Sequence, residues 1–172
     1  MNLRNYVRDI PDFPKKGIIF RDITPLLKDP NAFKYSIDSL AEAVKDKQYD
    51  LICAPEARGF IFGAPLAYKL GIGFVPIRKP GKLPAEVVSM KYDLEYGKAE
   101  IQIHKDAIKD GQKVLLFDDV LATGGTMEAT INLIEKSGGI VDDILFLINL
   151  TYLPGEKKIK ELGYNVISLI DL

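Results

Sequence analysis

The sequence predicts an α/β protein in which a central, mainly parallel, twisted sheet is flanked by helices. Short apolar runs typical of strands alternate with segments of helical spacing along residues 51–170, a pattern typical of parallel sheets covered by helices on both faces. The chain has 172 residues, which is the usual size of one domain and is long enough to bury a core. We therefore expect a single domain spanning residues 1–172.

The amino-terminal part of the chain is expected to contain two helices and one short strand. Four apolar residues at helical spacing predict a short amphipathic helix that ends at Pro11, namely Leu3, Tyr6, Val7 and Ile10. Residues 18–20 are strand-like. Asp29 followed by Pro30 is typical of a helix start, and the apolar face behind this pair predicts a helix that continues to about Lys45.

Strands and helices alternate in the remainder of the chain. The apolar runs predict strands at 51–54, 74–77, 113–117, 144–150 and 166–170. Helical spacing predicts helices at 60–70, 126–137 and 156–162. Gly71 is suited to end the first of these helices. Pro76 has no amide hydrogen, so its strand is expected at an edge or to end there.

One long segment, from residue 78 to about 93, does not fit this alternation. It contains two prolines, a glycine and a cluster of cations at its start. Loops of this length are uncommon in compact domains and are usually functional or disordered. A floppy excursion is the simpler interpretation, but we expect a mobile lid over an active site, within a flexible loop of about 78–100.

Charge and cysteine content exclude several classes of protein. The 23 Lys and Arg residues balance 24 Asp and Glu residues, which argues against an extended nucleic-acid-binding surface but leaves room for a small anion site. One cysteine excludes an internal disulfide and a Cys-rich zinc site, and fits a reducing compartment. No apolar run approaches the roughly 20 residues that span a bilayer, and the first residues do not resemble a signal peptide. We expect a cytoplasmic protein without a membrane partner.

The most informative segment is 114–126, where a strand leads into two aspartates, a turn of small residues and a helix. Asp118 and Asp119 would stand at the carboxyl end of a parallel strand, where ligands bind in such sheets. The turn Ala122–Thr126 has little side-chain bulk, so its amide groups and the helix N-terminus can approach a phosphate. A side chain at Gly124 should therefore block the anion. Phosphate and carboxylates at one strand end suit a sugar phosphate, whose hydroxyls donate to the acids.

This segment resembles the phosphoribosyl-diphosphate (PRPP) signature of type I phosphoribosyltransferases. Four more segments resemble the members of that family that act on adenine, in the same order along the chain: 19–25, 56–60, 78–84 and 92–97. The resemblance implies the type I phosphoribosyltransferase fold, with a small N-terminal hood at about 1–30 and a long flexible catalytic loop. It also implies a homodimer that works in purine salvage, transferring the phosphoribosyl group of PRPP to adenine to give AMP and diphosphate.

The resemblance assigns roles to individual residues. The ribose hydroxyls would be held by Asp118 and Asp119. The 5-phosphate would be held by Ala122, Thr123, Gly124, Gly125 and Thr126. The diphosphate would be held by Glu56, Ala57, Arg58, Arg78, Lys79 and Lys82. Adenine would lie between Phe20 and Leu150, with the backbone of Arg21 reading its polar edge.

Three of the predicted residues would be catalytic. Glu95 matches the acidic position of the family that handles a proton near the base. Arg58 and Lys82 would stabilise the negative charge that develops on the departing diphosphate. The family also commonly has a non-proline cis peptide in the diphosphate loop, here expected between Glu56 and Ala57.

Magnesium and two alternative functions complete the expectations. The resemblance implies Mg²⁺ held mainly by oxygens of the substrate and by water, so we name no protein metal ligand. One alternative is the same chemistry on hypoxanthine, guanine or xanthine, because a few hydrogen bonds decide the choice of base. The other is a PRPP-sensing regulator without catalysis, which the balanced charge and the absence of a basic stripe disfavour.

Overall fold

The computed structural model describes residues 1–93 and 97–172. Its strands are β1 (Arg8–Pro11), β2 (Ile19–Asp22), β3 (Leu51–Pro55), β4 (Gly73–Ile77), β5 (Val87–Asp93), β6 (Lys98–His104), β7 (Lys113–Leu121), β8 (Ile140–Asn149) and β9 (Asn165–Asp171). Its helices are the short 3₁₀ helix η1 (Leu3–Tyr6), α1 (Thr24–Lys28), α2 (Pro30–Ala43), α3 (Arg58–Leu70), α4 (Gly125–Lys136) and α5 (Gly155–Glu161). None of the helices within the described residues is long and apolar enough to cross a membrane.

The central sheet confirms the predicted fold class. Its five strands have the order β4-β3-β7-β8-β9, and every neighbouring pair is parallel. Pro76 lies in β4, the edge strand, where a missing amide hydrogen costs no ladder hydrogen bond. Parallel pairing brings the carboxyl ends of β3 and β7 to the same edge of the sheet.

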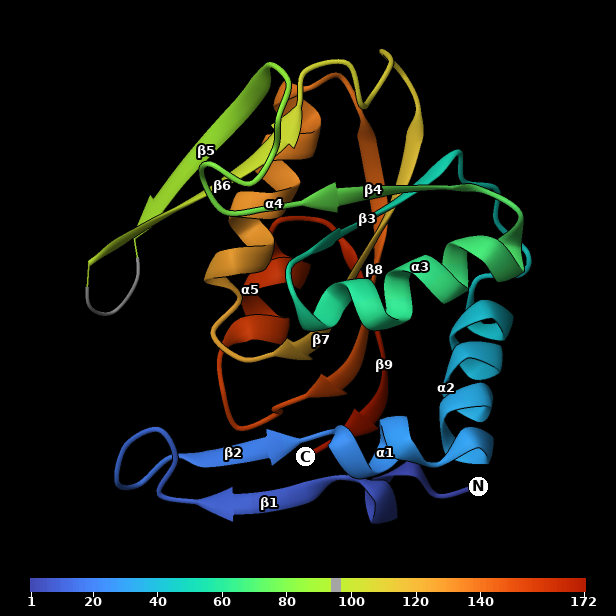
Figure 1. Ribbon diagram of the computed structural model, residues 1–172, viewed down its shortest axis with the longest axis vertical. Coiled ribbons are helices and arrows are strands. Elements are labelled where there is room, and N and C mark those ends of the chain that lie inside the picture. Colours follow the sequence, from blue (N-terminus) through green and yellow to red (C-terminus); the bar gives the residue numbers. More distant parts are fainter. Residues whose placement is uncertain (94–96) are drawn as a thin grey trace.

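Helices cover both faces of this sheet (Figure 1). Apolar residues of α2 and α3 pack with Leu115 and Phe117 of β7 in one buried cluster. Residues of α4 and α5 pack with Val114 and Leu116 of the same strand in the other. Alternate residues of a strand point to opposite faces, so the continuous apolar run of β7 supplies both layers of the core.

The predicted amino-terminal helix is wrong beyond Tyr6. Only η1 is helical, and the chain then forms β1, which pairs with β2 as an antiparallel hairpin. The apolar spacing that indicates a helix is also compatible with η1 followed by a strand, because Leu3 and Val7 are both buried against the core in that arrangement. The hairpin forms a separate two-stranded sheet beside the C-terminal end of the chain (Figure 1).

The segment predicted as a long lid without secondary structure is also more regular than expected. Residues 87–93 form β5, which pairs antiparallel with β6 and packs against α4. Arg78 forms a further bridge to Gln102 of β6. The cation-rich part up to Glu86 has no strand or helix. Glu95, which was expected to handle a proton, lies outside the described residues.

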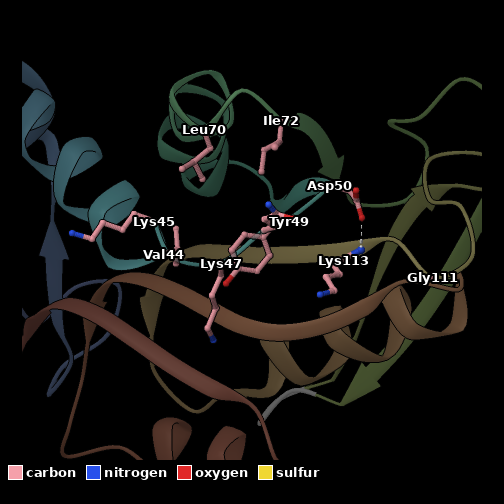
Figure 2. A pocket seen from close by; sticks show the side chains of 10 residues that line it. Val44, Lys45, Lys47, Tyr49, Asp50, Leu70, Ile72, Gly111 and Lys113 are labelled. Atoms are coloured by element: carbon pink, nitrogen blue, oxygen red, sulfur yellow. Dashed lines mark hydrogen bonds between the residues drawn. The ribbon is translucent and has the colours of Figure 1, made fainter.

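The amino-terminal edge of the sheet carries a cavity of about 550 Å³, which Figure 2 shows from close by. Lys47 and Tyr49 line it, and so do Asp50 and Lys113, which are joined by a hydrogen bond from the Lys113 amide to the Asp50 carboxylate at 2.7 Å. None of the described residues predicted for the active site lines this cavity. Asp50 and Lys113 stand at the starts of β3 and β7, so the cavity lies at the opposite end of these strands from Asp118 and Asp119.

Two residues that line this cavity also contact a buried acid: the fully buried carboxylate of Asp143 accepts hydrogen bonds from Lys47 and Tyr49, and a third from Asn165. Burial alone would raise the pKa of Asp143, but the hydrogen bonds from its three partners outweigh it and hold this pKa below its usual value. A carboxyl group whose pKa is lower in the folded state than in the unfolded state stabilises the fold at pH values above its unfolded-state pKa. This stabilisation is lost as the pH falls through its folded-state pKa.

We therefore expect Asp143→Asn to lower the free energy of unfolding by about 2 kcal/mol at pH 7, because hydrogen bonds to a charged group contribute roughly 1.5–3 kcal/mol. Urea titrations at pH 7 and at pH 3 measure this difference. The gap between variant and wild type should shrink at pH 3. An equal gap at both pH values would contradict a role for the charge.

Candidate active site

Asp118 and Asp119 lie within β7, which continues to Leu121 instead of ending before them. Asp118 is half-buried, Asp119 is buried, and the Asp119 amide donates to the Asp118 carboxylate at 2.9 Å. Burial and the neighbouring Asp119 charge raise the pKa of Asp118 well above its usual value. Burial also raises the pKa of Asp119, although the charge of Arg58 opposes the shift. Two acids held in this way are poorly solvated and suited to accept hydrogen bonds from a ligand.

The predicted phosphate turn forms a hollow immediately after these acids. A cavity of about 80 Å³ is lined by Asp118 and by all five residues from Ala122 to Thr126. Gly124 has a φ of +82° and caps the N-terminus of α4. The first turn of a helix leaves amide groups without intrahelical partners and carries partial positive charge. The hollow thus combines free amide donors, hydroxyls and a favourable potential for an anion.

The two glycines of the turn face different surroundings. A Cβ at Gly124 would lie 3.2 Å from the Cα of Gly155, at the start of α5, so this side of the turn is closed by protein backbone. A Cβ at Gly125 would meet nothing within 4 Å. A side chain at Gly124 would therefore point toward α5, whereas one at Gly125 would point into open space. The expectation that a side chain at Gly124 blocks an anion stays a prediction.

Gly155 supports the turn from behind, a role the sequence did not reveal. Its amide donates to the carbonyl of Ala122 at 3.1 Å. A Cβ on Gly155 would lie 2.3 Å from that same carbonyl oxygen, which no side chain could tolerate. The only signal in the sequence is a glycine after Pro154 at a helix start, and this does not tell which loop it contacts.

Arg58, at the start of α3, connects the acids with the hood. Its Nε lies 2.6 Å from Asp119 Oδ2, and its guanidinium lies over the ring of Phe20, 5.1 Å from the centroid. The ring of Phe13 packs edge-on against Phe20 at 5.3 Å. The structure thus brings together three residues that the sequence places far apart: Phe20, Arg58 and Asp119.

The loop before α3 has the expected cis peptide between Glu56 and Ala57. The Glu56 carboxylate accepts from the Lys79 amide at 2.5 Å and from Arg78 Nη2 at 3.3 Å. These contacts, the first of them above all, hold the pKa of Glu56 below its usual value. The Glu56 carboxylate thus fixes the Arg78 guanidinium and the backbone of Lys79, and the binding of diphosphate by this loop stays a prediction.

These cations border a second cavity of about 210 Å³, lined by Glu56, Arg78, Lys79 and Thr126 among others. Thr126 belongs to both cavities, so the phosphate turn and the diphosphate loop meet at this residue. Tyr92 of β5, which the sequence did not single out, also lines this cavity, and its hydroxyl is 3.4 Å from that of Thr126. Lys82 is exposed, and its carbonyl accepts from Arg78 at 3.4 Å.

The remaining predicted base-binding residues lie on two separate elements. Arg21 belongs to β2, and its Nη1 lies 2.6 Å from Asp9 Oδ1 of β1. Leu150 follows β8, is only 8% exposed and donates its amide to the carbonyl of Leu121 at 3.0 Å. Leu150 packs mostly against the core, and its contact with a base through the exposed remainder stays a prediction.

Comparisons with known proteins agree with this geometry. The family model described as "Phosphoribosyl transferase domain" matches residues 23–141. An adenine phosphoribosyltransferase of Thermosipho africanus is 63% identical over 172 residues, covering 100% of both chains. One of Thermoanaerobacter sp. (strain X514) is 62% identical over 168 residues, covering 98% of this chain and 96% of its own. The chain belongs to the adenine phosphoribosyltransferases.

Solved structures of this family have the same fold. The adenine phosphoribosyltransferase of Thermoanaerobacter pseudethanolicus matches with a TM-score of 0.95 and 60% identity, over 99% of this chain and 98% of its own. The Saccharomyces cerevisiae enzyme, solved with an imino-altritol bisphosphate and adenine, matches with a TM-score of 0.89 and 38% identity, over 96% and 95%. The resemblance stated from the motifs is therefore confirmed, and with it the assignment as a transferase that acts on adenine.

Proposed function

We propose that this chain makes AMP and diphosphate from adenine and PRPP at the site formed by β7, α3, the turn before α4 and the β1–β2 hairpin. The observation that carries the proposal is the hollow of about 80 Å³, which Asp118 and the glycine turn line together. A pentose 5-phosphate needs both features side by side, because its anion and its hydroxyls lie within one small molecule.

The residue roles follow from this placement. The amides of residues 123–126 and the hydroxyls of Thr123 and Thr126 hold the 5-phosphate, while Asp118 and Asp119 accept from the ribose hydroxyls. Arg58 then exchanges its contact with Asp119 for the diphosphate, with Arg78, Lys79 and Lys82 adding positive charge. As the bond from ribose C1 to diphosphate breaks, N9 of adenine forms the new bond to C1. The proton on N9 is released toward Glu95.

Adenine is held between Phe20 and Leu150, with its polar edge at the backbone of Arg21. Stacking on an aromatic ring accepts any purine, so discrimination depends on the backbone donors and acceptors of β2. A base with an oxo group in place of the amino group exchanges donor for acceptor and leaves a buried polar group unpaired.

Magnesium is part of the proposal as a metal that arrives with the substrate. Within residues 1–93 and 97–172, no group of three or more His, Cys, Asp or Glu side chains could hold a metal ion. Mg²⁺ would be bound through the diphosphate and ribose oxygens of PRPP and through water, and would neutralise charge on the leaving group. Asp118 and Asp119 are the protein groups that would lie nearest to it, through the ribose hydroxyls.

We also propose a homodimer in the cytoplasm. On α3, Tyr68 is 89% exposed and Ile61 is 38% exposed, and apolar side chains exposed on one helix favour a partner surface. Cys53 is a free, buried thiol whose pKa is raised by burial, which suits a reducing compartment.

Steady-state assays of nucleotide formation from PRPP with adenine, hypoxanthine, guanine and xanthine test the function. We expect kcat/KM for adenine to exceed that for each oxopurine by at least about 100-fold, because a mismatched buried hydrogen bond costs roughly 1–3 kcal/mol and adenine makes more than one. Preferential use of hypoxanthine would defeat the assignment of the base. Sequence-specific nucleic-acid binding without nucleotide formation would favour the regulator instead.

A further inference from the structure

The β1–β2 hairpin, which carries Phe20 and Arg21, needs anchors to stay in place. It is a two-stranded sheet separate from the central one, and such a hairpin is marginally stable by itself in water. The position of its base-binding residues relative to Leu150, on the other side of the proposed adenine slot, therefore depends on a few contacts between hairpin and body.

The side chain of Arg21 first makes a contact within the hairpin itself. Asp9 and Arg21 are direct cross-strand partners, and their side chains form an ion pair of 2.6 Å. Asp9 also pairs with Arg4 of η1, and Arg4 donates to the carbonyl of Val7 at 2.8 Å. The Arg21 side chain is only 11% exposed, so this pair is screened less than an ordinary surface pair.

The same guanidinium reaches the opposite side of the slot. The guanidinium of Arg21 also interacts with the side chain of Tyr152, and the interaction contributes to the raised pKa of Arg21; Tyr152 lies two residues after Leu150. The turn that carries Tyr152 is fixed to the body, because Leu153 donates to the carbonyl of Leu150 at 2.9 Å and Thr151 donates to the carbonyl of Leu172 at 2.8 Å. Arg21 thus connects the separate β1–β2 sheet with a turn that is fixed to the body.

We propose that Asp9, Arg21 and Tyr152 form a strut that sets the spacing between the two walls of the adenine slot, which makes Asp9 and Tyr152 positioning residues for the base. The inference rests on the proposed function, because it needs adenine to bind between Phe20 and Leu150. Neither positioning residue touches the phosphate turn or the acids of β7, so the strut acts on adenine and not on PRPP.

The variants Asp9→Asn and Tyr152→Phe each remove one end of the strut with little change of shape. Tyr152 is 62% exposed, so losing its hydroxyl leaves the core intact. We expect each variant to raise the KM for adenine by about three- to tenfold, with kcat and the KM for PRPP within about twofold of wild type. The preference for adenine over hypoxanthine should fall by a similar factor, because a less firmly held β2 makes less specific hydrogen bonds to the polar edge of the base.

Asp38→Asn is the matched control. Asp38 also joins two cations, Lys34 and Lys69, each at 2.6 Å, but on α2 and α3 outside the slot. The Asp38→Asn variant should leave the KM for adenine and the KM for PRPP unchanged. The double variant Asp9→Asn/Tyr152→Phe should raise the KM for adenine by less than the product of the two single effects, because both act through Arg21.

The outcomes separate the strut from the proposed function. An unchanged KM for adenine, an equal rise in both KM values, or single effects that multiply fully in the double variant would each overturn the strut while AMP formation by the wild type stands. Failure of the wild type to form AMP would overturn the function and the strut together.

Discussion

Replacing Asp118 and Asp119 together by asparagine is expected to lower kcat/KM for PRPP by about 10³-fold without unfolding the protein. Each carboxylate accepts from a ribose hydroxyl in the proposed complex, and hydrogen bonds to charged groups contribute roughly 1.5–3 kcal/mol each. Asparagine keeps the size of the side chain but removes the charge and one acceptor. Initial rates at varied PRPP and saturating adenine measure the loss.

The stability of this variant should rise, not fall, which separates a ligand-binding role from a structural one. Burial and mutual repulsion raise the pKa of Asp118, and burial raises that of Asp119. A group with a raised folded-state pKa stabilises the fold fully below its unfolded pKa, and loses that contribution as the pH rises through the folded one. The ionised acids therefore cost stability at pH 7, and neutral asparagines remove this cost, offset in part by the lost ion pair with Arg58.

Thermal unfolding at several pH values checks this sign. The Tm of the double variant relative to wild type should increase between pH 4 and pH 7. A second adjacent acid pair, Asp142 and Asp143 on β8, supplies the control, since Asp143→Asn should lose stability and keep kcat/KM. Unimpaired turnover in the Asp118→Asn/Asp119→Asn variant, or a Tm that drops as far as in Asp143→Asn, would contradict the ribose role.

The contrast between these two acid pairs shows which parts of the site can be predicted from the sequence. Asp118–Asp119 stands out because a turn of small residues and a helix start follow it, and local order alone places all of these at one strand end. Asp142–Asp143 has no such neighbours. Its partners Lys47 and Tyr49 lie more than 90 positions away, so only the folded chain shows that Asp143 is an anchor.

The wrong sequence predictions, and the missed role of Gly155, also come from contacts between residues distant in sequence. Residues 3–10 satisfy a helical pattern, but pairing of β1 with β2 decides the structure of their second half. The lid segment reads as irregular because its prolines and cations precede β5, whose partner β6 follows only after residue 97. Gly155 supports the phosphate turn through a contact between elements that no local pattern encodes. The spacing of apolar residues predicts helices and strands well where local sequence determines them. It predicts them poorly where pairing with a distant segment determines the structure.

Gly125→Val is expected to raise the KM for PRPP by more than about 100-fold while leaving the fold intact. A Cβ at this position meets nothing within 4 Å, so the side chain would extend into the space proposed for the 5-phosphate. The anion would then lose two or more charge-assisted hydrogen bonds from the turn, at roughly 1.5–3 kcal/mol each. Calorimetric titration with PRPP, together with thermal unfolding, measures both properties of the same sample.

Gly124→Ala is the matched comparison, one residue away in the same turn. The new Cβ would lie 3.2 Å from the backbone of Gly155, and residue 124 has a φ of +82°, which side chains rarely adopt. The substitution should therefore lower the Tm by several degrees. Each variant thus isolates one reason for a glycine: backbone shape at 124 and open space at 125. Retained PRPP affinity in Gly125→Val would mean that the anion lies elsewhere. A Tm loss in Gly125→Val as large as in Gly124→Ala would mean that the open space at this position supports the fold and not the ligand.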